Sequence, residues 1–93
     1  MSEDLKMRIA KAAEVLKAAG AREVYVFGSA ATGTMREDSD VDLAVSGLPP
    51  EKFFAAMGAA GKLLEIPFDL VDLDEDSPFT EYLKRKGKLE RVA

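Results

Sequence analysis

Two acidic side chains near the middle of the chain alternate with apolar residues. The segment DVDLAV, residues 40–45, places Asp40 and Asp42 on one face of a strand and Val41, Leu43 and Val45 on the other. Two carboxylates ~5 Å apart repel by about 3 kcal/mol at an effective dielectric constant near 20, and a divalent cation between them reverses that sign. Oxygen ligands from few protein groups suit Mg²⁺. The pattern therefore indicates a magnesium site, or, taken alone, a solvated strand edge.

A phosphate-binding element is indicated earlier in the chain. Gly28 and Ser29 directly follow the apolar segment EVYVF, which has the composition of a strand. Backbone N–H groups and a hydroxyl at such a position can hold a phosphate. Gly-Ser alone ends many strands, but Gly-Ser followed after ten residues by Asp-x-Asp on the next strand is far more specific.

Helices and strands that would carry these residues follow from local patterns. Apolar residues at helical spacing predict one helix that ends before Gly20 and another that starts at Ser77-Pro78 and ends before Gly87. They also predict a third helix that opens at Pro49-Pro50. In that third helix we expect a buried stripe of Phe53, Met57, Ala60 and Leu64, widened by Phe54. Strands are expected at 23–27, 41–46 and 68–73. The order predicts a single α/β domain over residues 1–93, a small mixed sheet covered by helices on one face.

Composition excludes several classes of protein. The chain has 93 residues, no cysteine and a formal net charge of -4. A disulfide framework and a thiolate zinc site are therefore excluded, and we expect no broad nucleic-acid binding, no membrane span and no secretory leader, hence a cytoplasmic protein. Basic residues gather in the segment LKRKGKLER, residues 83–91. This segment is either a solvated helix end or a docking surface for a partner or a nucleotide.

The segment GSAATGTMREDSDVDLAV, residues 28–45, resembles the signature of the DNA polymerase β-like nucleotidyltransferase superfamily. The resemblance extends over roughly residues 20–92. The short length and the ending FDLVDLDEDSPFTEYLKRKGKLERVA are similar to the minimal nucleotidyltransferases, which form the antitoxin half of pairs with HEPN-domain toxins. The fold implied is the nucleotidyltransferase fold.

The resemblance implies a phosphate-binding role for the first part of this segment. Gly28 and Ser29 would contact the β- and γ-phosphates of a nucleoside triphosphate. The family often has basic residues just after Gly-Ser, and this chain has Ala30 and Thr32 in those places. Arg36 stands where many relatives carry a basic residue, and would either contribute to phosphate binding or lie on the surface without a catalytic role.

The resemblance also implies a catalytic and metal-binding role for three carboxylates. Asp40 and Asp42 would hold two Mg²⁺ ions, and a third carboxylate would come from the strand after the second helix. That strand offers Asp69 and Asp72, which point to opposite faces because they differ by three positions. Asp69 matches the family-like FDLV pattern and is our choice, with Asp72 as the alternative.

The function implied is transfer of a nucleotide, AMP from ATP, to a hydroxyl acceptor, which in relatives is a tyrosine of a HEPN toxin. The chain has no histidine, so a histidine general base is excluded. The alternative is an antitoxin without catalytic activity that neutralises a helical partner by contact. Self-association through an exposed sheet edge also stays open at this point.

Overall fold

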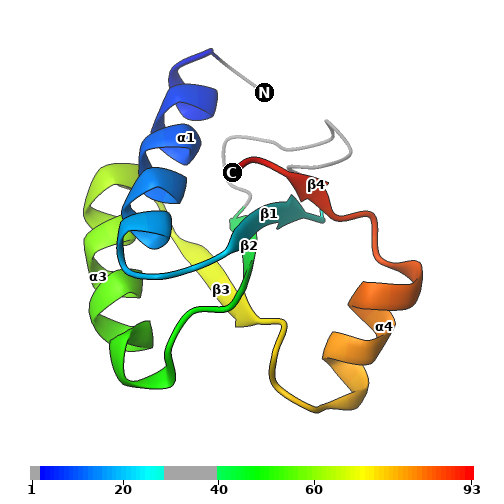
Figure 1. The fold of residues 1–93 in the computed structure, drawn as a ribbon. Coiled ribbons are helices and arrows are strands. Elements are labelled where there is room, and N and C mark those ends of the chain that lie inside the picture. Colours follow the sequence, from blue (N-terminus) through cyan, green and yellow to red (C-terminus); the bar gives the residue numbers. More distant parts are fainter. Residues whose placement is uncertain (1–2, 29–39) are drawn as a thin grey trace.

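The computed structural model describes residues 3–28 and 40–93 (Figure 1). Ser29 and Arg36 lie outside the described residues. The elements, in chain order, are α1 (Glu3–Ala18), β1 (Glu23–Phe27), β2 (Val41–Ser46), the 3₁₀ turn η1 (Pro50–Lys52), α3 (Phe53–Leu64), β3 (Phe68–Asp72), α4 (Pro78–Lys86) and β4 (Glu90–Arg91).

The strands form one mixed sheet in the order β3-β2-β1-β4. β1 is antiparallel to β2 and to β4, whereas β2 and β3 are parallel. The parallel pair is possible because the chain returns through α3, as a crossover connection requires. The prediction of a small mixed sheet with helices is confirmed.

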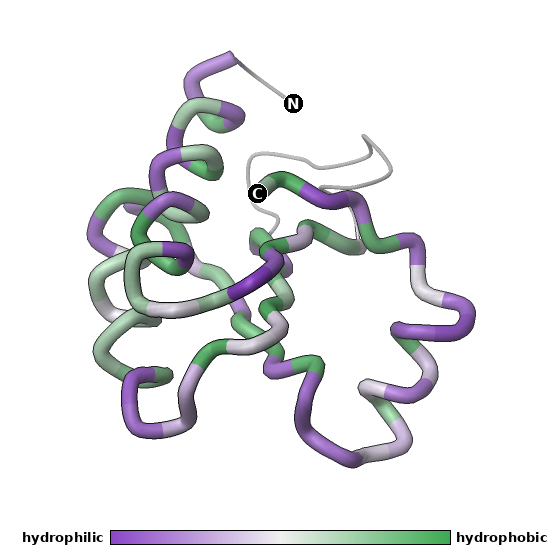
Figure 2. The backbone as a smooth tube through the Cα atoms, viewed as in Figure 1, coloured by the Kyte–Doolittle hydropathy of each residue, from purple (hydrophilic) through white to green (hydrophobic). Residues whose placement is uncertain are grey.

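α1 and α3 cover one face of the sheet and lie side by side in Figure 1. Hydrophobic and hydrophilic residues alternate along α1, as expected for a helix with one buried side (Figure 2). The residues that share this main core come from both helices and from alternate positions of the strands: Ile9, Ala12, Leu16, Val24, Val26, Val41, Leu43, Val45, Ala56, Ala60 and Leu64. The alternation read from DVDLAV therefore assigns this face correctly.

A smaller apolar cluster lies on the opposite face of the sheet. Ala44 is fully buried there, together with Leu73 and Leu83 of α4. Tyr25 and Val71 pack against the same cluster. α4 therefore covers one end of the sheet face that carries Asp42.

α4 begins as the sequence predicts, at Ser77-Pro78. The Ser77 hydroxyl accepts a hydrogen bond from the Thr80 backbone N–H at 3.2 Å, and the Ser77 N–H donates to the Thr80 hydroxyl at 3.2 Å. Thr80 is buried and also donates to the Glu75 carbonyl at 2.5 Å. This reciprocal capping fixes where α4 leaves the loop that follows β3.

Three local expectations differ from the structure. Phe54 is 77% exposed, and Phe53 and Met57 are only half-buried, because the buried line of α3 runs through Ala56, Ala60 and Leu64. Helix α3 begins at Phe53, after a 3₁₀ turn at the prolines. β4 was not expected; its two residues are too short for a periodic pattern, and it is held by pairing with β1 and by the Arg91–Glu23 ion pair at 3.4 Å.

Within residues 3–28 and 40–93, no helix has the length and apolar character to cross a bilayer.

Candidate active site

Asp42 and Asp69 lie at the same position of the parallel ladder between β2 and β3. Paired positions of adjacent strands present their side chains on the same face of the sheet. This face is opposite the main core, because the neighbouring residues Val41 and Leu43 are buried beneath α1 and α3. The sheet therefore brings together two carboxylates that are separated by 27 positions in the sequence, as the register of Asp42 with Asp69 shows.

The electrostatics of Asp42 reflect its acidic neighbours. Asp42 is half-buried, whereas Asp40 and Asp69 are exposed. Burial raises the pKa of Asp42, and the negative charges of Asp69 and then Asp40 raise this pKa further. The charges of Asp40 and Asp69 thus both act on Asp42 and disfavour its ionised form.

The alternative third carboxylate, Asp72, lies elsewhere. It is the register partner of Val45, whose side chain belongs to the main core. One oxygen of Asp72 accepts a hydrogen bond from the Asp74 backbone N–H at 2.9 Å. Asp72 thus stabilises the turn after β3, and Asp69 is the acidic residue of β3 that stands next to Asp42.

Gly28 adjoins the same carboxylate. Its φ is +66°, a conformation that side-chain-bearing residues rarely adopt. A Cβ atom at this position would lie 2.5 Å from Oδ2 of Asp42. The positive φ is therefore the main reason for glycine at the end of β1, and an added Cβ would also displace the terminal oxygen of Asp42. The sequence predicted Gly28 for phosphate binding and gave no sign of this contact.

The donor chemistry of these residues suits Mg²⁺. Asp40, Asp42 and Asp69 offer only carboxylate oxygens, the ligands that Mg²⁺ prefers, and their mutual repulsion raises the pKa of Asp42 in a way that a cation would relieve. As placed, no group of three or more acidic side chains within the described ranges is arranged to hold a metal ion. The donor set fits Mg²⁺, and the side chains would have to converge on it.

Sequence reasoning missed two features on the acidic face. Phe27 is the register partner of Asp42 on β1, and its ring meets that of Phe79 edge-on, with centroids 6.4 Å apart. Alternation along β1 could have placed Phe27 on this face, but only the antiparallel register sets it against Asp42. The contact with Phe79 follows from the position of α4, which no local pattern specifies.

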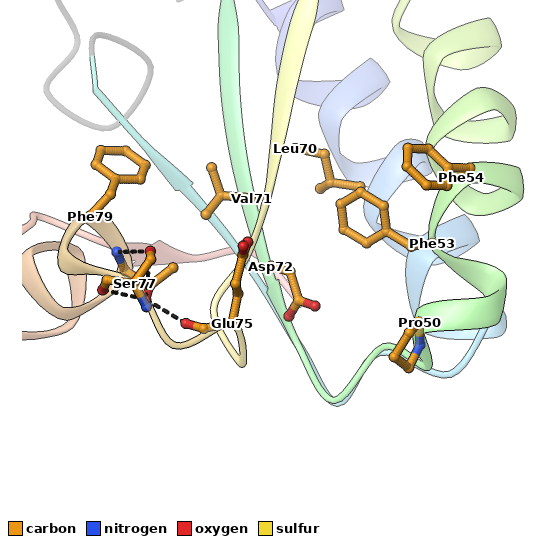
Figure 3. Close-up of a pocket in the computed structure, with 10 residues that line it drawn as sticks. Pro50, Phe53, Phe54, Leu70, Val71, Asp72, Glu75, Ser77 and Phe79 are labelled. Atoms are coloured by element: carbon orange, nitrogen blue, oxygen red, sulfur yellow. Dashed lines mark hydrogen bonds between the residues drawn. The ribbon is translucent and has the colours of Figure 1, made fainter.

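A pocket of about 450 Å³ lies beside the outer strand β3 and is lined by residues of α3, β3 and the start of α4. In Figure 3, Leu70 and Phe53 lie on one side of β3, and Val71 and Phe79 lie on the other. Acidic residues Asp72 and Glu75 also line this pocket (Figure 3). It is separate from the carboxylates of Asp42 and Asp69, since neither lines it.

Comparisons with known proteins agree with this arrangement. A family model described as polymerase beta, nucleotidyltransferase matches residues 9–89. No curated protein sequence matches the chain at a significant level. A solved structure described as a minimal nucleotidyltransferase is 32% identical, with a TM-score of 0.68, and the match covers 89% of this chain and 92% of that chain.

Two further solved structures share the fold at lower identity. A toxin–antitoxin crystal structure with AMP-PNP has a TM-score of 0.70 at 21% identity, and the match covers 99% of this chain and 73% of that one. A complex of the tri-AMPylated HEPN toxin of Shewanella oneidensis with an MNT antitoxin has a TM-score of 0.66 at 19% identity. The match covers 96% of this chain and 71% of that chain. From the match over residues 9–89 and the 32% identical structure, the chain belongs to the polymerase β nucleotidyltransferase family.

Proposed function

We propose that this chain is a magnesium-dependent nucleotidyltransferase that transfers AMP from ATP to a hydroxyl group. The observation that carries the proposal is the pairing of Asp42 with Asp69 on the sheet face opposite the main core, with Asp40 close enough to affect the pKa of Asp42. These three residues would be the catalytic and metal-binding carboxylates. Gly28, with Ser29 and Arg36 beyond the described residues, would bind the phosphates.

The chain's own groups would do the following. Asp40, Asp42 and Asp69 would hold Mg²⁺, which when bound lowers the pKa of an acceptor hydroxyl and stabilises negative charge on the leaving group. Gly28, lacking a side chain, lets a phosphate approach the end of β1 beside Asp42. In the overall reaction the acceptor oxygen forms a bond to the α-phosphorus, the α–β phosphoanhydride bond breaks, and pyrophosphate leaves.

A HEPN-type helical protein is the acceptor that we propose, through one of its tyrosines. The support is the fold shared with the MNT antitoxin that accompanies a tri-AMPylated HEPN toxin. We place this chain, by the same reasoning, in a cytoplasmic toxin–antitoxin pair.

The experiment is incubation of the purified chain with ATP labelled on the adenosine, Mg²⁺ and the HEPN protein encoded beside it. We expect label on the partner, lost when the partner's tyrosines are replaced by phenylalanine. The matched chain variants are Asp42→Asn, which should abolish transfer, and Asp72→Asn, which should not, since Asp72 lies away from Asp42. Transfer that persists in Asp42→Asn would contradict the proposal.

A second candidate function, neutralisation of the partner by contact alone, is favoured by the pocket around β3. Phe54 and Phe79 border this pocket with 77% and 51% of their surfaces exposed, and Asp72 and Glu75 add negative charge. Exposed aromatic rings beside an apolar hollow are typical of protein interfaces. The complementary partner surface would be apolar with a basic rim.

The two functions are separated by two variants. Phe54→Ser should weaken binding of the partner by about tenfold or more without affecting AMP transfer to a small hydroxyl acceptor. Met7→Ser is the control, since Met7 is 59% exposed on α1 and does not line this pocket. Protection from the toxin that survives Asp42→Asn and fails in Phe54→Ser would favour contact over catalysis.

A further inference from the structure

A second hollow, of about 420 Å³, lies between the end of β1 and α4. It belongs to the acidic face of the sheet, because Phe27 lines it and is the register partner of Asp42. Aromatic rings and lysines supply most of its side chains, together with Leu83. The residues that matter here are Phe27, Gly28, Phe79, Tyr82, Lys86 and Lys88.

Gly28 joins this hollow to the carboxylates. It lines the hollow on one side, and on the other its Cα lies so near Asp42 that a Cβ would meet Oδ2 at 2.5 Å. A ligand that touches Gly28 from the hollow is therefore a close neighbour of Asp42.

The two lysines of the hollow are available to an anion. Both are exposed, and the ion pairs found among residues 3–28 and 40–93 involve neither of them. By contrast, Arg8 and Arg91 are engaged by acidic partners. Figure 2 shows the hydrophilic residues that end α4.

A nucleoside triphosphate beside three carboxylates needs positive charge near its phosphates. We infer that Lys86 and Lys88 bind the phosphate tail of the nucleotide, and that this tail lies in the hollow next to Gly28. The inference rests on the proposed function. Lysine acts on phosphate as a compact point charge and needs no fixed fork geometry, which suits two flexible side chains at the end of a helix.

Aromatic rings border the two lysines. The rings of Phe27 and Phe79 meet edge-on, with centroids 6.4 Å apart, and Tyr82 extends the apolar surface along α4. Because both lysines are exposed, their attraction to a phosphate is that of charges at a protein surface.

A structural role for the same lysines has to be separated from this one. Lys84, Arg85 and Lys86 all lie in the last turn of α4, where positive charge stabilises the helix dipole. Lys84 and Arg85 do not line the hollow. The double variant Lys84→Ala/Arg85→Ala therefore removes the same charge as Lys86→Ala/Lys88→Ala while leaving the hollow intact.

The test measures binding of ATP, inorganic tripolyphosphate and adenosine by calorimetry, each with Mg²⁺. We expect Lys86→Ala/Lys88→Ala to weaken the binding of ATP and of tripolyphosphate at least tenfold, ~1.4 kcal/mol. We expect Lys84→Ala/Arg85→Ala to change both affinities less than threefold. Circular dichroism checks that each variant is folded. Equal losses in both double variants, or no loss in either, would overturn the inference.

Two further outcomes keep this inference distinct from the proposed function. Tripolyphosphate binding that depends on Lys86 and Lys88, without any AMP transfer, would support the phosphate subsite and contradict the transferase. AMP transfer by the Lys86→Ala/Lys88→Ala variant with unchanged affinity for ATP would support the transferase and contradict the phosphate subsite. Adenosine binding that is lost in Tyr82→Ala, without tripolyphosphate binding, would assign the hollow to the base and overturn the phosphate subsite.

Discussion

Asp42 of β2 and Asp69 of β3 share one position of a parallel ladder, while Asp72, three residues further along β3, is paired with the buried Val45. Asp69→Asn should therefore reduce AMP transfer by about 100-fold or more, because loss of a metal-binding charge removes several kcal/mol of transition-state stabilisation. Asp72→Asn keeps the oxygen that accepts from Asp74 and should retain most activity. The initial rate of label transfer measures both. Equal losses in the two variants would contradict the assignment of Asp69.

Asp42→Asn should make the folded protein more stable at neutral pH. Burial first, and then Asp69 and Asp40, raise the pKa of Asp42 when the protein folds. Between the ordinary and the raised pKa the folded state therefore binds more protons than the unfolded state, so the free energy of unfolding decreases as pH rises through that window. Above the raised pKa the penalty is complete, and below the ordinary pKa it is absent.

The measurement is the thermal midpoint without metal, at pH 7 and at a pH well below the ordinary pKa of aspartate. For a partly exposed group the gain is on the order of 0.5 kcal/mol, about 2–4 °C for a domain of this size, and it should vanish in acid. Asp76→Asn, in the exposed loop before α4, is the control. Added Mg²⁺ should stabilise the wild type and so reduce the difference in thermal midpoint between it and Asp42→Asn. A gain of the same size at both pH values would exclude the electrostatic explanation.

Gly28→Ala should destabilise the protein by about 1–3 kcal/mol, since alanine is strained at a φ of +66° and its Cβ would collide with the Asp42 carboxylate. Gly58→Ala is the matched control. Gly58 lies within α3 with nothing within 4 Å of an added Cβ, so the same substitution should stabilise by roughly 0.5–1 kcal/mol. Urea unfolding compares the two, and a Gly28→Ala variant as stable as the wild type would refute the close approach.

Thr80→Val should cost about 1–3 kcal/mol, because it keeps the shape of a buried side chain but removes the hydroxyl that accepts from the Ser77 N–H and donates to the Glu75 carbonyl. Thr80→Ser retains the hydroxyl and loses one methyl group, for about 0.8 kcal/mol. Chemical denaturation should rank the serine variant as the more stable of the two; the opposite order would mean that packing, not capping, fixes α4.

Much of the fold was predictable because its elements are locally encoded. The alternation in DVDLAV identified the core face of β2, and Ser77-Pro78 identified the start of α4. Phe54 was expected to widen the buried stripe of α3, yet the residues of that helix that are buried are Ala56, Ala60 and Leu64. β4 depends on pairing with β1 and has no periodic pattern of its own.

The site was predictable in its residue types and less so in its contacts. Asp40 and Asp42 follow from spacing on one strand, but the match of Asp42 to Asp69 requires the parallel register, which is set by the crossover through α3. The positive φ of Gly28 and its contact with Asp42 likewise arise only when β1 and β2 are paired. Resemblance to a known family selected Asp69 before any geometry was available.

Ala44 sets how near α4 can come to the sheet. It is fully buried in the same cluster as Leu83, two positions along β2 from Asp42. A bulkier residue at this position would push α4 away from the sheet. Lys86 and Lys88 would then move away from Gly28 without contacting the substituted residue. The small side chain of Ala44 thus helps to set the distance between the two lysines and the carboxylates beside Gly28.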